Sequence, residues 1–274
     1  MENIDILVAL DENYLPPLKV MLTSLFFNNP GEKFRIWIMY SHISKEKLDS
    51  LDKNLKALNM ELHSVKVNEE DFKFDYTVGR YTYEMYYRLL AQHILPKSVK
   101  RVIYLDPDVL VINPVRELWE LDLNGKFYAA ASHTGATGLS DEVNKIRLGT
   151  DHKYFNSGVL LIDLNLARKR TSSNNMFKYV KEHKVELVLP DQDVLNGLYG
   201  SHIMEIEDAI WNYDARNYNT YYVKSGGEMD TMWVMQNTAI LHFCGSAKPW
   251  QPKYRYRFGV LYMHYMKKSS YYFD

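Results

Sequence analysis

Residues 101–111 have the sequence RVIYLDPDVLV, and this stretch decides the fold. The apolar run from Val102 to Leu105 predicts a buried strand, and Asp106-Pro107-Asp108 follows it directly. Two carboxylates on extended backbone at a strand end can project into a shared site. Because like charges so close together repel, we expect a hard divalent cation to neutralise them through oxygen ligands. A surface turn with two acids remains the alternative interpretation.

Strand and helix patterns alternate on the N-terminal side of this stretch. Apolar runs predict strands at 4–10, 34–40, 61–67 and 101–105. Apolar residues at helical spacing predict helices at 19–27, 44–58 and 83–94 between them. This alternation predicts an α/β fold with a mostly parallel central sheet flanked by helices, and a ligand cleft at the carboxyl ends of the strands.

The patterns beyond residue 108 are looser. They predict strands at 109–112, 127–131, 155–164, 203–206 and 238–243, with helices near 141–147 and 165–183. No internal repeat, low-complexity tract or flexible linker interrupts the sequence. We therefore expect a single domain over residues 1–250, followed by a short C-terminal tail over residues 251–274.

Composition narrows the classes of function. Thirty-four acidic residues against 33 lysines and arginines leave a net charge of −1, so nucleic acid is not an expected partner. The single cysteine, Cys244, excludes an internal disulfide. Neither a signal-like segment nor a run of about 18 apolar residues occurs, which predicts a soluble, cytoplasmic protein. Dinucleotide and phosphate-loop glycine motifs are also absent from the sequence, so a bound phosphate would need another source of positive charge, such as a metal.

Residues 242–250, HFCGSAKPW, form a second candidate site at the end of an apolar run. The neutral imidazole of His242 is a good ligand for a manganese-like ion. Gly245 would let backbone approach a phosphate closely, and Lys248 would offset phosphate charge. A hydrogen-bonded core histidine is the alternative for His242.

Polar residues at two further positions are candidates for ligand contact. Asp191 and Gln192 precede a helical run, where Asp191 either caps the helix or faces a ligand. Asn156 interrupts an apolar run, and its side chain either bonds buried backbone or reaches a ligand hydroxyl.

The order of these segments resembles glycosyltransferase family 8, a retaining family that includes bacterial lipopolysaccharide galactosyl- and glucosyltransferases and, more distantly, glycogenin. The similarity covers nearly all of the first 250 residues. The segments that carry it are IDILVALDENY at 4–14, YRL at 87–89, YLDPD at 104–108, FNSG at 155–158, DQD at 191–193 and HFCGSAKPW at 242–250.

This resemblance implies the GT-A glycosyltransferase fold, a UDP-sugar donor and a divalent cation, Mn²⁺ or Mg²⁺. The implied metal ligands are Asp106, Asp108 and His242. The residues implied to act at the reacting centre are Asp191 and Gln192. The implied donor-binding residues are Ala9, Asp11, Asn13, Tyr14, Arg88, Asp106, Asn156, Gly245 and Lys248, with Tyr14 a candidate to stack on uracil.

The implied reaction moves galactose or glucose from the UDP-sugar to a hydroxyl of a saccharide or glycolipid acceptor, in lipopolysaccharide or another cell-surface polysaccharide. Retention requires either a covalent intermediate or attack from the leaving-group face. Because the amide of Gln192 is a weak nucleophile, we favour same-face attack. Two departures from the family, Ser132-His133 in place of an acidic residue and Ser246 in place of a proline, fall toward the acceptor, so acceptor identity is not carried over.

Three alternatives stay open. The basic, aromatic tail at 251–274 would either rest on the inner face of the cytoplasmic membrane or form a helix packed on the domain. An apolar strand followed by Asp-x-Asp also fits a haloacid-dehalogenase-like phosphatase. The 22 tyrosines and five tryptophans would also suit a non-catalytic saccharide-binding protein, although aromatic residues are more often core.

Overall fold

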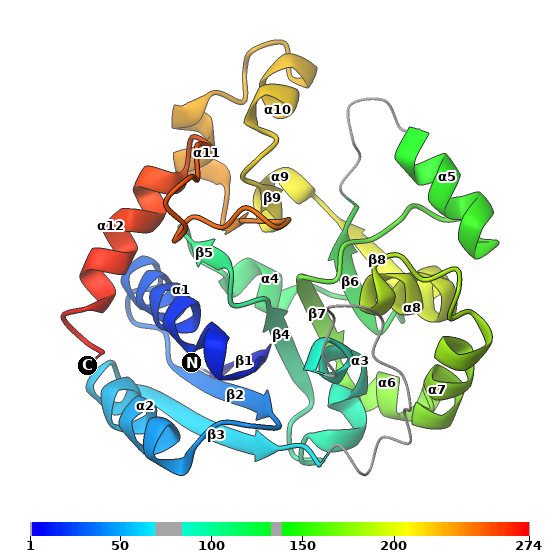
Figure 1. Ribbon diagram of the computed structural model, residues 1–274, viewed down its shortest axis with the longest axis horizontal. Coiled ribbons are helices and arrows are strands. Elements are labelled where there is room, and N and C mark those ends of the chain that lie inside the picture. Colours follow the sequence, from blue (N-terminus) through cyan, green and yellow to red (C-terminus); the bar gives the residue numbers. More distant parts are fainter. Residues whose placement is uncertain (1, 69–83, 133–138, 274) are drawn as a thin grey trace.

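The computed structural model describes residues 2–68, 84–132 and 139–273, and its centre is a seven-stranded sheet (Figure 1). The strand order is β3-β2-β1-β4-β7-β6-β8. Strands β1 to β4 pair in parallel, as do β6 and β8, whereas β7 runs antiparallel to both of its neighbours. The prediction of a mostly parallel sheet is confirmed. The strands are β1 (Ile4–Ala9), β2 (Phe34–Tyr40), β3 (Met60–Lys66), β4 (Arg101–Leu105), β6 (Tyr128–Ala131), β7 (Val159–Asp163) and β8 (Ile203–Ile206).

Helices cover both faces of this sheet, which explains why its inner strands are apolar without alternation. On β1, Ile6 and Val8 face a core shared with α1 (Leu15–Asn28) and α2 (Lys45–Ala57). Leu7 faces the opposite core, which is shared with four other helices. Those helices are α3 (Glu84–Ile94), α6 (Leu164–Arg170), α7 (Ser173–Glu182) and α8 (Pro190–Tyr199).

A second, three-stranded sheet lies beyond the end of β4, in the order β5-β10-β9. It consists of β5 (Val109–Val111), β10 (Ile240–His242) and β9 (Tyr213–Asp214). The antiparallel register of β5 and β10 sets His242 opposite Val109, the residue after Asp108. This pairing brings two segments far apart in the sequence to one point. Further helices in the described ranges are α4 (Arg116–Glu120), α5 (Leu139–Leu148), α9 (Asp208–Trp211), α10 (Tyr218–Lys224) and α11 (Thr231–Asn237), with short 3-10 turns at Glu12–Tyr14 and Gly200–His202.

The C-terminal tail is packed on the domain. Its helix α12 (Gly259–Ser269) lies against α1, where Asn28 Nδ2 donates to the Tyr265 hydroxyl over 2.7 Å (Figure 1). The aromatic side chains of Phe258, Tyr262 and Phe273 are buried. The packed-helix alternative is therefore confirmed, and the tail offers no support for the membrane hypothesis. No helix in the described ranges is both long and apolar enough to cross a membrane.

Among the predicted elements that differ from the structure, two have a clear local cause. The single helix expected at 165–183 is two helices, α6 and α7, because Thr171 and Ser172 adopt extended backbone between them. Hydroxyl side chains compete for backbone hydrogen bonds in this way, and Thr171 Oγ1 donates to the Ala167 carbonyl over 2.9 Å. The strand expected to begin at residue 155 begins at Val159. The backbone N–H of Phe155 donates to the side chain of Asn196 on α8, and the Phe155 carbonyl accepts from the same side chain, so neither group is available to pair with a strand.

Candidate active site

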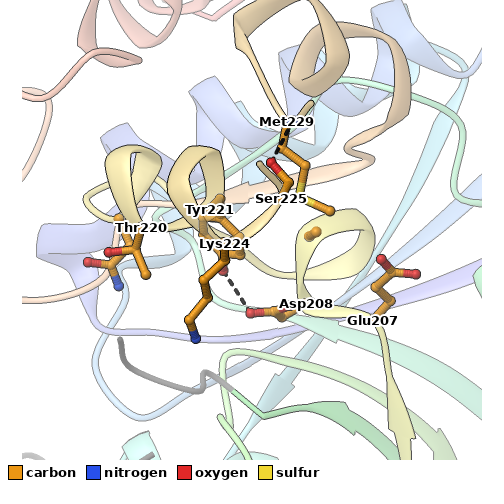
Figure 2. A pocket seen from close by; sticks show the side chains of 9 residues that line it. Glu207, Asp208, Thr220, Tyr221, Lys224, Ser225 and Met229 are labelled. Carbon is orange, nitrogen blue, oxygen red and sulfur yellow. Dashed lines mark hydrogen bonds between the residues drawn. The ribbon is translucent and has the colours of Figure 1, made fainter. Parts of the chain in front are cut away.

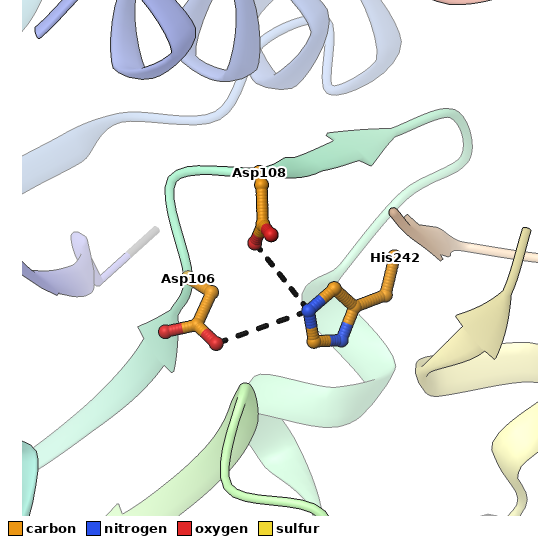
Figure 3. Close-up of side chains that lie close together, drawn as sticks. All are labelled: Asp106, Asp108 and His242. Atoms are coloured by element: carbon orange, nitrogen blue, oxygen red, sulfur yellow. Dashed lines mark ion pairs between the residues drawn. The ribbon is translucent and has the colours of Figure 1, made fainter. Parts of the chain in front are cut away.

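Three of the predicted ligand side chains converge where β4 and β10 end. Asp106, Asp108 and His242 each offer a ligand atom within 4.8 Å of the other two (Figure 3). The His242 Nε2 atom lies 3.4 Å from Asp108 Oδ1 and 3.8 Å from Asp106 Oδ2. All three atoms therefore face one common point.

The chemistry of these side chains fits a divalent cation. Two carboxylates and an imidazole form a donor set that suits Mn²⁺ or Mg²⁺. Asp108 Oδ1 is buried and has no hydrogen-bond partner in the described part of the chain, which is costly unless something else coordinates it. Gly158 clears the space, because a Cβ there would lie 2.7 Å from Asp106 Oδ2 and closer still to the ring of His242.

Lys248 supplies positive charge beside this cluster. Its ammonium forms an ion pair with Asp108 Oδ2 and donates to the Phe243 carbonyl over 2.9 Å. Burial by itself would raise the pKa of Asp108, but His242 and Lys248 more than offset that effect and hold the pKa below its ordinary value. Asp108 is therefore an anion in the folded protein.

Arg88, on α3, joins the β4 end to α8. Its Nη2 lies 2.9 Å from Asp106 Oδ1, and its Nη1 lies 3.4 Å from Asp191 Oδ2 and 3.0 Å from the Ser157 carbonyl. The guanidinium sits 4.5 Å above the ring of Tyr104, whose hydroxyl donates to Asp106 over 2.6 Å. Burial raises the pKa of Asp191, and the charge of Arg88 opposes that rise. The carboxylates of Asp106 and Asp191 thus share the buried guanidinium of Arg88.

A chain of amide side chains connects His242 to Gln192. Asn212 Oδ1 lies 2.8 Å from His242 Nδ1, and Asn212 Nδ2 donates to Asn156 Oδ1 over 2.9 Å. Asn156 Nδ2 in turn donates to Gln192 Oε1 over 3.0 Å, and the Ser157 amide donates to the same oxygen over 3.3 Å. Sequence reasoning missed Asn212 and Ser157. Ser157 stood within a quoted motif, whereas Asn212 lies in a segment with no pattern that would have revealed it.

Two adjoining cavities contain most of the predicted donor-binding residues. One, of about 190 Å³, is lined in part by Ala9, Asp11, Tyr14, Arg88, Asp106 and Asp108. The other, of about 600 Å³, is lined in part by Asn13, Tyr14, Gly245, Lys248 and Trp250. Tyr14 borders both cavities, and its ring lies edge-on to Trp250 with centroids 6.2 Å apart. We call the two cavities together the cleft.

Two residues of the cleft also have clear local roles. Asp11 caps the 3-10 turn that carries Tyr14, since its carboxylate accepts from the Asn13 amide over 2.8 Å. Gly245 has φ +83°, a left-handed conformation that favours glycine, and a Cβ there would collide with the guanidinium of Arg216. Of the two residues predicted to fall toward the acceptor side, Ser132 donates from Oγ to Glu205 over 2.7 Å, and His133 lies outside the described residues.

A further cavity, of about 210 Å³, lies between α9 and α10, away from the predicted site residues (Figure 2). Its lining includes Asp208, Tyr221 and Lys224, and the Tyr221 hydroxyl donates to Asp208 Oδ2 over 2.8 Å. None of the predicted site residues lines it. This cavity is therefore distinct from the cleft.

Known proteins share both the fold and the family. The galactosyltransferase LgtC, solved in complex with donor and acceptor sugar analogs, matches with a TM-score of 0.82 and 26% identity, covering 97% of this chain and 96% of that one. The fold and the site thus define a glycosyltransferase of the GT-A type. The chain belongs to glycosyl transferase family 8, whose family model matches residues 5–253. This membership decides against the phosphatase and the non-catalytic alternatives.

Two curated relatives are similar over most of their length. General stress protein A of Bacillus subtilis is 29% identical over 277 residues, covering 98% of this chain and 95% of the relative. A lipopolysaccharide 1,2-glucosyltransferase of Escherichia coli is 24% identical, covering 91% of this chain and 74% of the relative.

Proposed function

We propose that this protein is a metal-dependent, retaining hexosyltransferase. It takes galactose or glucose from a UDP-sugar and attaches it to a hydroxyl of a saccharide or glycolipid acceptor, in lipopolysaccharide or another cell-surface polysaccharide. The observation that carries this proposal is the convergence of Asp106, Asp108 and His242 beside Lys248 at one wall of the cleft. The low cysteine content fits work in the reducing cytoplasm.

The diphosphate end of the donor would bind beside the acidic cluster. Asp106, Asp108 and His242 would hold Mn²⁺ or Mg²⁺, which when bound supplies Lewis acidity to a diphosphate leaving group. Lys248 lines the larger cavity and can exchange its contact with Asp108 for a contact with phosphate. Gly245, exposed in the same cavity, leaves its backbone open to that phosphate. Lys248 would thus lie beside the diphosphate, where negative charge develops as the bond to the sugar breaks.

The sugar end of the donor would lie toward α8. Arg88, Asn156, Asp191 and Gln192 are joined there by hydrogen bonds and ion pairs, which holds their polar atoms in fixed directions. The oxygen of Gln192 already accepts from Asn156 and from the Ser157 amide, so the group is positioned but weakly nucleophilic. This favours same-face attack by the acceptor hydroxyl, with Gln192 stabilising the anomeric centre.

Two of the relatives are named for different hexoses. One is named as a lipopolysaccharide 1,2-glucosyltransferase of Escherichia coli, and another, 23% identical, as a lipopolysaccharide 1,3-galactosyltransferase of Salmonella typhimurium. Galactose and glucose differ at one stereocentre, so a few side chains suffice to discriminate them. Both sugars therefore belong in the test.

Thermal unfolding with UDP, UDP-glucose and UDP-galactose, each with and without Mn²⁺, tests the donor site. A ligand at 100 times its dissociation constant stabilises by about 2.7 kcal/mol, a shift of several degrees in the melting temperature. We expect a Mn²⁺-dependent shift that is lost in the Asp106→Ala/Asp108→Ala variant. Asp49→Ala, at an exposed position on α2, is the matched control and should keep the shift. A cooperative melt unaffected by every UDP ligand would count against the proposal.

A further inference from the structure

Another cavity borders the cleft and has no role in donor binding as proposed above. Its volume is about 590 Å³, and it shares Trp250 and Gln251 with the larger cavity of the cleft. We call it the tail groove. The lining residues that matter for its chemistry are Trp250, Tyr254, Arg255, Tyr256, Arg257 and Met263.

One backbone turn connects the tail groove to the acidic cluster. The Gln251 amide donates to the Lys248 carbonyl over 2.9 Å, and the Lys248 amide donates to Gln251 Oε1 over 3.1 Å. Lys248 extends from this turn to Asp108, whereas Trp250 and Gln251 form the wall that the two cavities share. A chain-like ligand that leaves the cleft past Trp250 therefore enters the tail groove.

The charge of the tail groove is positive. Arg255 and Arg257 line it, and its described lining contains no acidic residue. Arg257 is already engaged, since its guanidinium lies 4.0 Å above the Tyr218 ring and donates to Thr231 Oγ1 over 3.2 Å. Arg255 is exposed and makes no hydrogen bond or ion pair within the described ranges. An arginine with a planar fork of donors suits a carboxylate or phosphate group.

Aromatic faces complete the tail groove. The rings of Tyr254 and Tyr256 lie edge-to-face with centroids 5.2 Å apart, and Tyr256 is 43% exposed. Trp250 is wedged between Tyr14 and the buried ring of Tyr262, so its position is fixed. Rigid aromatic walls with a few polar groups are typical of small-molecule and saccharide sites.

We propose that the tail groove binds an anionic part of the acceptor, namely sugar units that carry a carboxylate or phosphate next to the unit that receives the hexose. This inference rests on the proposed function, because it supplies the acceptor side of the same reaction. The wall that the tail groove shares with the cleft favours a saccharide over a lipid surface. Four of the tail aromatics, Phe258, Tyr262, Tyr265 and Phe273, are buried against the domain and are not available to a membrane surface.

Calorimetric titration with tetragalacturonate and with maltotetraose, at low salt and in the presence of UDP and Mn²⁺, tests the proposal. We expect the acidic oligosaccharide to bind at least about tenfold more tightly than the neutral one, and the difference to shrink as salt is added. Arg255→Gln should weaken tetragalacturonate binding by about tenfold. Arg170→Gln, an exposed arginine at the end of α6, is the matched control and should have no effect.

Three results would overturn the proposal. One is equal binding of the two oligosaccharides, and another is an acidic preference that survives in Arg255→Gln. The third is sedimentation with phosphatidylglycerol vesicles that depends on Arg255 while tetragalacturonate does not bind, which would assign the tail groove to a membrane. Thermal stabilisation of the wild type by UDP and Mn²⁺ is read in parallel, so failure of the donor site is distinguishable from failure of the tail groove.

Discussion

Asn212 sets the direction in which His242 faces. It is fully buried, and its Oδ1 lies 2.8 Å from His242 Nδ1, so the other ring nitrogen is directed at Asp106 and Asp108. A side chain that fixes the ring in this way acts through the histidine and need not touch the substrate. Asn212 is therefore a positioning residue for the acidic cluster.

The main expected effect of substituting Asn212 is weaker binding of the metal ion. We expect Asn212→Ala to reduce Mn²⁺ affinity by roughly 10–100-fold, because the imidazole loses its anchor. Asn212→Asp keeps an oxygen acceptor beside Nδ1 and should retain more of that affinity. Electron paramagnetic resonance of free Mn²⁺ measures both variants without a turnover assay. Equal losses of Mn²⁺ affinity in the two variants would show that the contact between residue 212 and His242 Nδ1 does not determine metal binding.

Gly158 is the second residue whose role is steric. A Cβ at this position would lie 2.7 Å from Asp106 Oδ2 and would overlap the His242 ring. We expect the added methyl group in Gly158→Ala to push the side chains of Asp106 and His242 apart. The variant should then lose the Mn²⁺-dependent thermal stabilisation by UDP. Gly149→Ala is not a fair control because Gly149 has positive φ. Ser50→Ala, at an exposed position on α2 outside the cleft, is the control and should keep the stabilisation. Unchanged Mn²⁺ binding in Gly158→Ala would contradict the steric argument.

The site residues that were predictable from the sequence share one property. Each lies at the end of an apolar strand: Asp106 directly follows β4, Asp108 directly precedes β5, and His242 is the last residue of β10. Their polarity therefore stood out at positions where a sheet presents side chains to a cleft. Asn212 follows the four-residue helix α9 and precedes a two-residue strand, so nothing around it marked a site. Its partner His242 is 30 residues away, and only the fold brings the two together.

At the scale of elements, α12 is joined to the domain by its aromatic side chains. Tyr262 is 1% exposed and contacts Phe243 and Trp250, whereas its neighbour Met263 is 48% exposed. We expect Tyr262→Ala to lower the free energy of unfolding by about 3–5 kcal/mol, and Met263→Ala to change it by less than about 0.5 kcal/mol. Urea unfolding of both variants measures the difference. Similar losses in the two would mean that α12 is not anchored through its buried face.

The loop before β2 is joined to α4 by an ion pair that responds to pH. Arg116 donates to both oxygens of Glu32, and these bonds hold the pKa of Glu32 below its ordinary value of 4.5. Because the folded pKa is depressed, the pair stabilises the protein above that value and loses its contribution as pH falls through the folded pKa.

Glu32→Gln tests this dependence. Near pH 7 the variant should be less stable than the wild type by up to about 1 kcal/mol, since the pair lies near the surface. The difference should shrink as pH falls below 4.5, the ordinary pKa of a glutamate. Urea unfolding over a pH series measures it, and a difference that stays constant with pH would contradict the assignment.

Element types were more predictable than element ends. The strand at 34–40 was predicted with its observed bounds because both its faces are apolar and turn signals flank it. Helix α1 begins at Leu15, four residues before the apolar pattern at 19–27, because Pro16 and Pro17 are accepted in the first turn. The short elements α9, α10 and β9 were not predicted, since fewer than eight residues carry too little periodicity.

For the whole molecule, the alternation of strands and helices predicted the parallel half of the sheet but not the rest. Strand β4 pairs with β1 on one side and with the reversed β7 on the other. Neither the direction of β7 nor the pairing of β5 with β10 leaves a local signal in the sequence, because both depend on contacts between distant segments. The part of the cleft at the ends of β1 and β4 was therefore more predictable than the part that depends on β7 and β10.

The pairing of β5 with β10 has a kinetic consequence. It brings Asp108 and His242, separated by about half the chain, to one point, so a shared ion would link the two halves like a reversible cross-link. Such a link must break before the halves separate. We expect saturating Mn²⁺ to slow unfolding in concentrated urea, measured by stopped-flow tryptophan fluorescence, and to leave the rate unchanged in Asp106→Ala/Asp108→Ala. The ion that would assist sugar transfer would then also set how long each molecule stays folded.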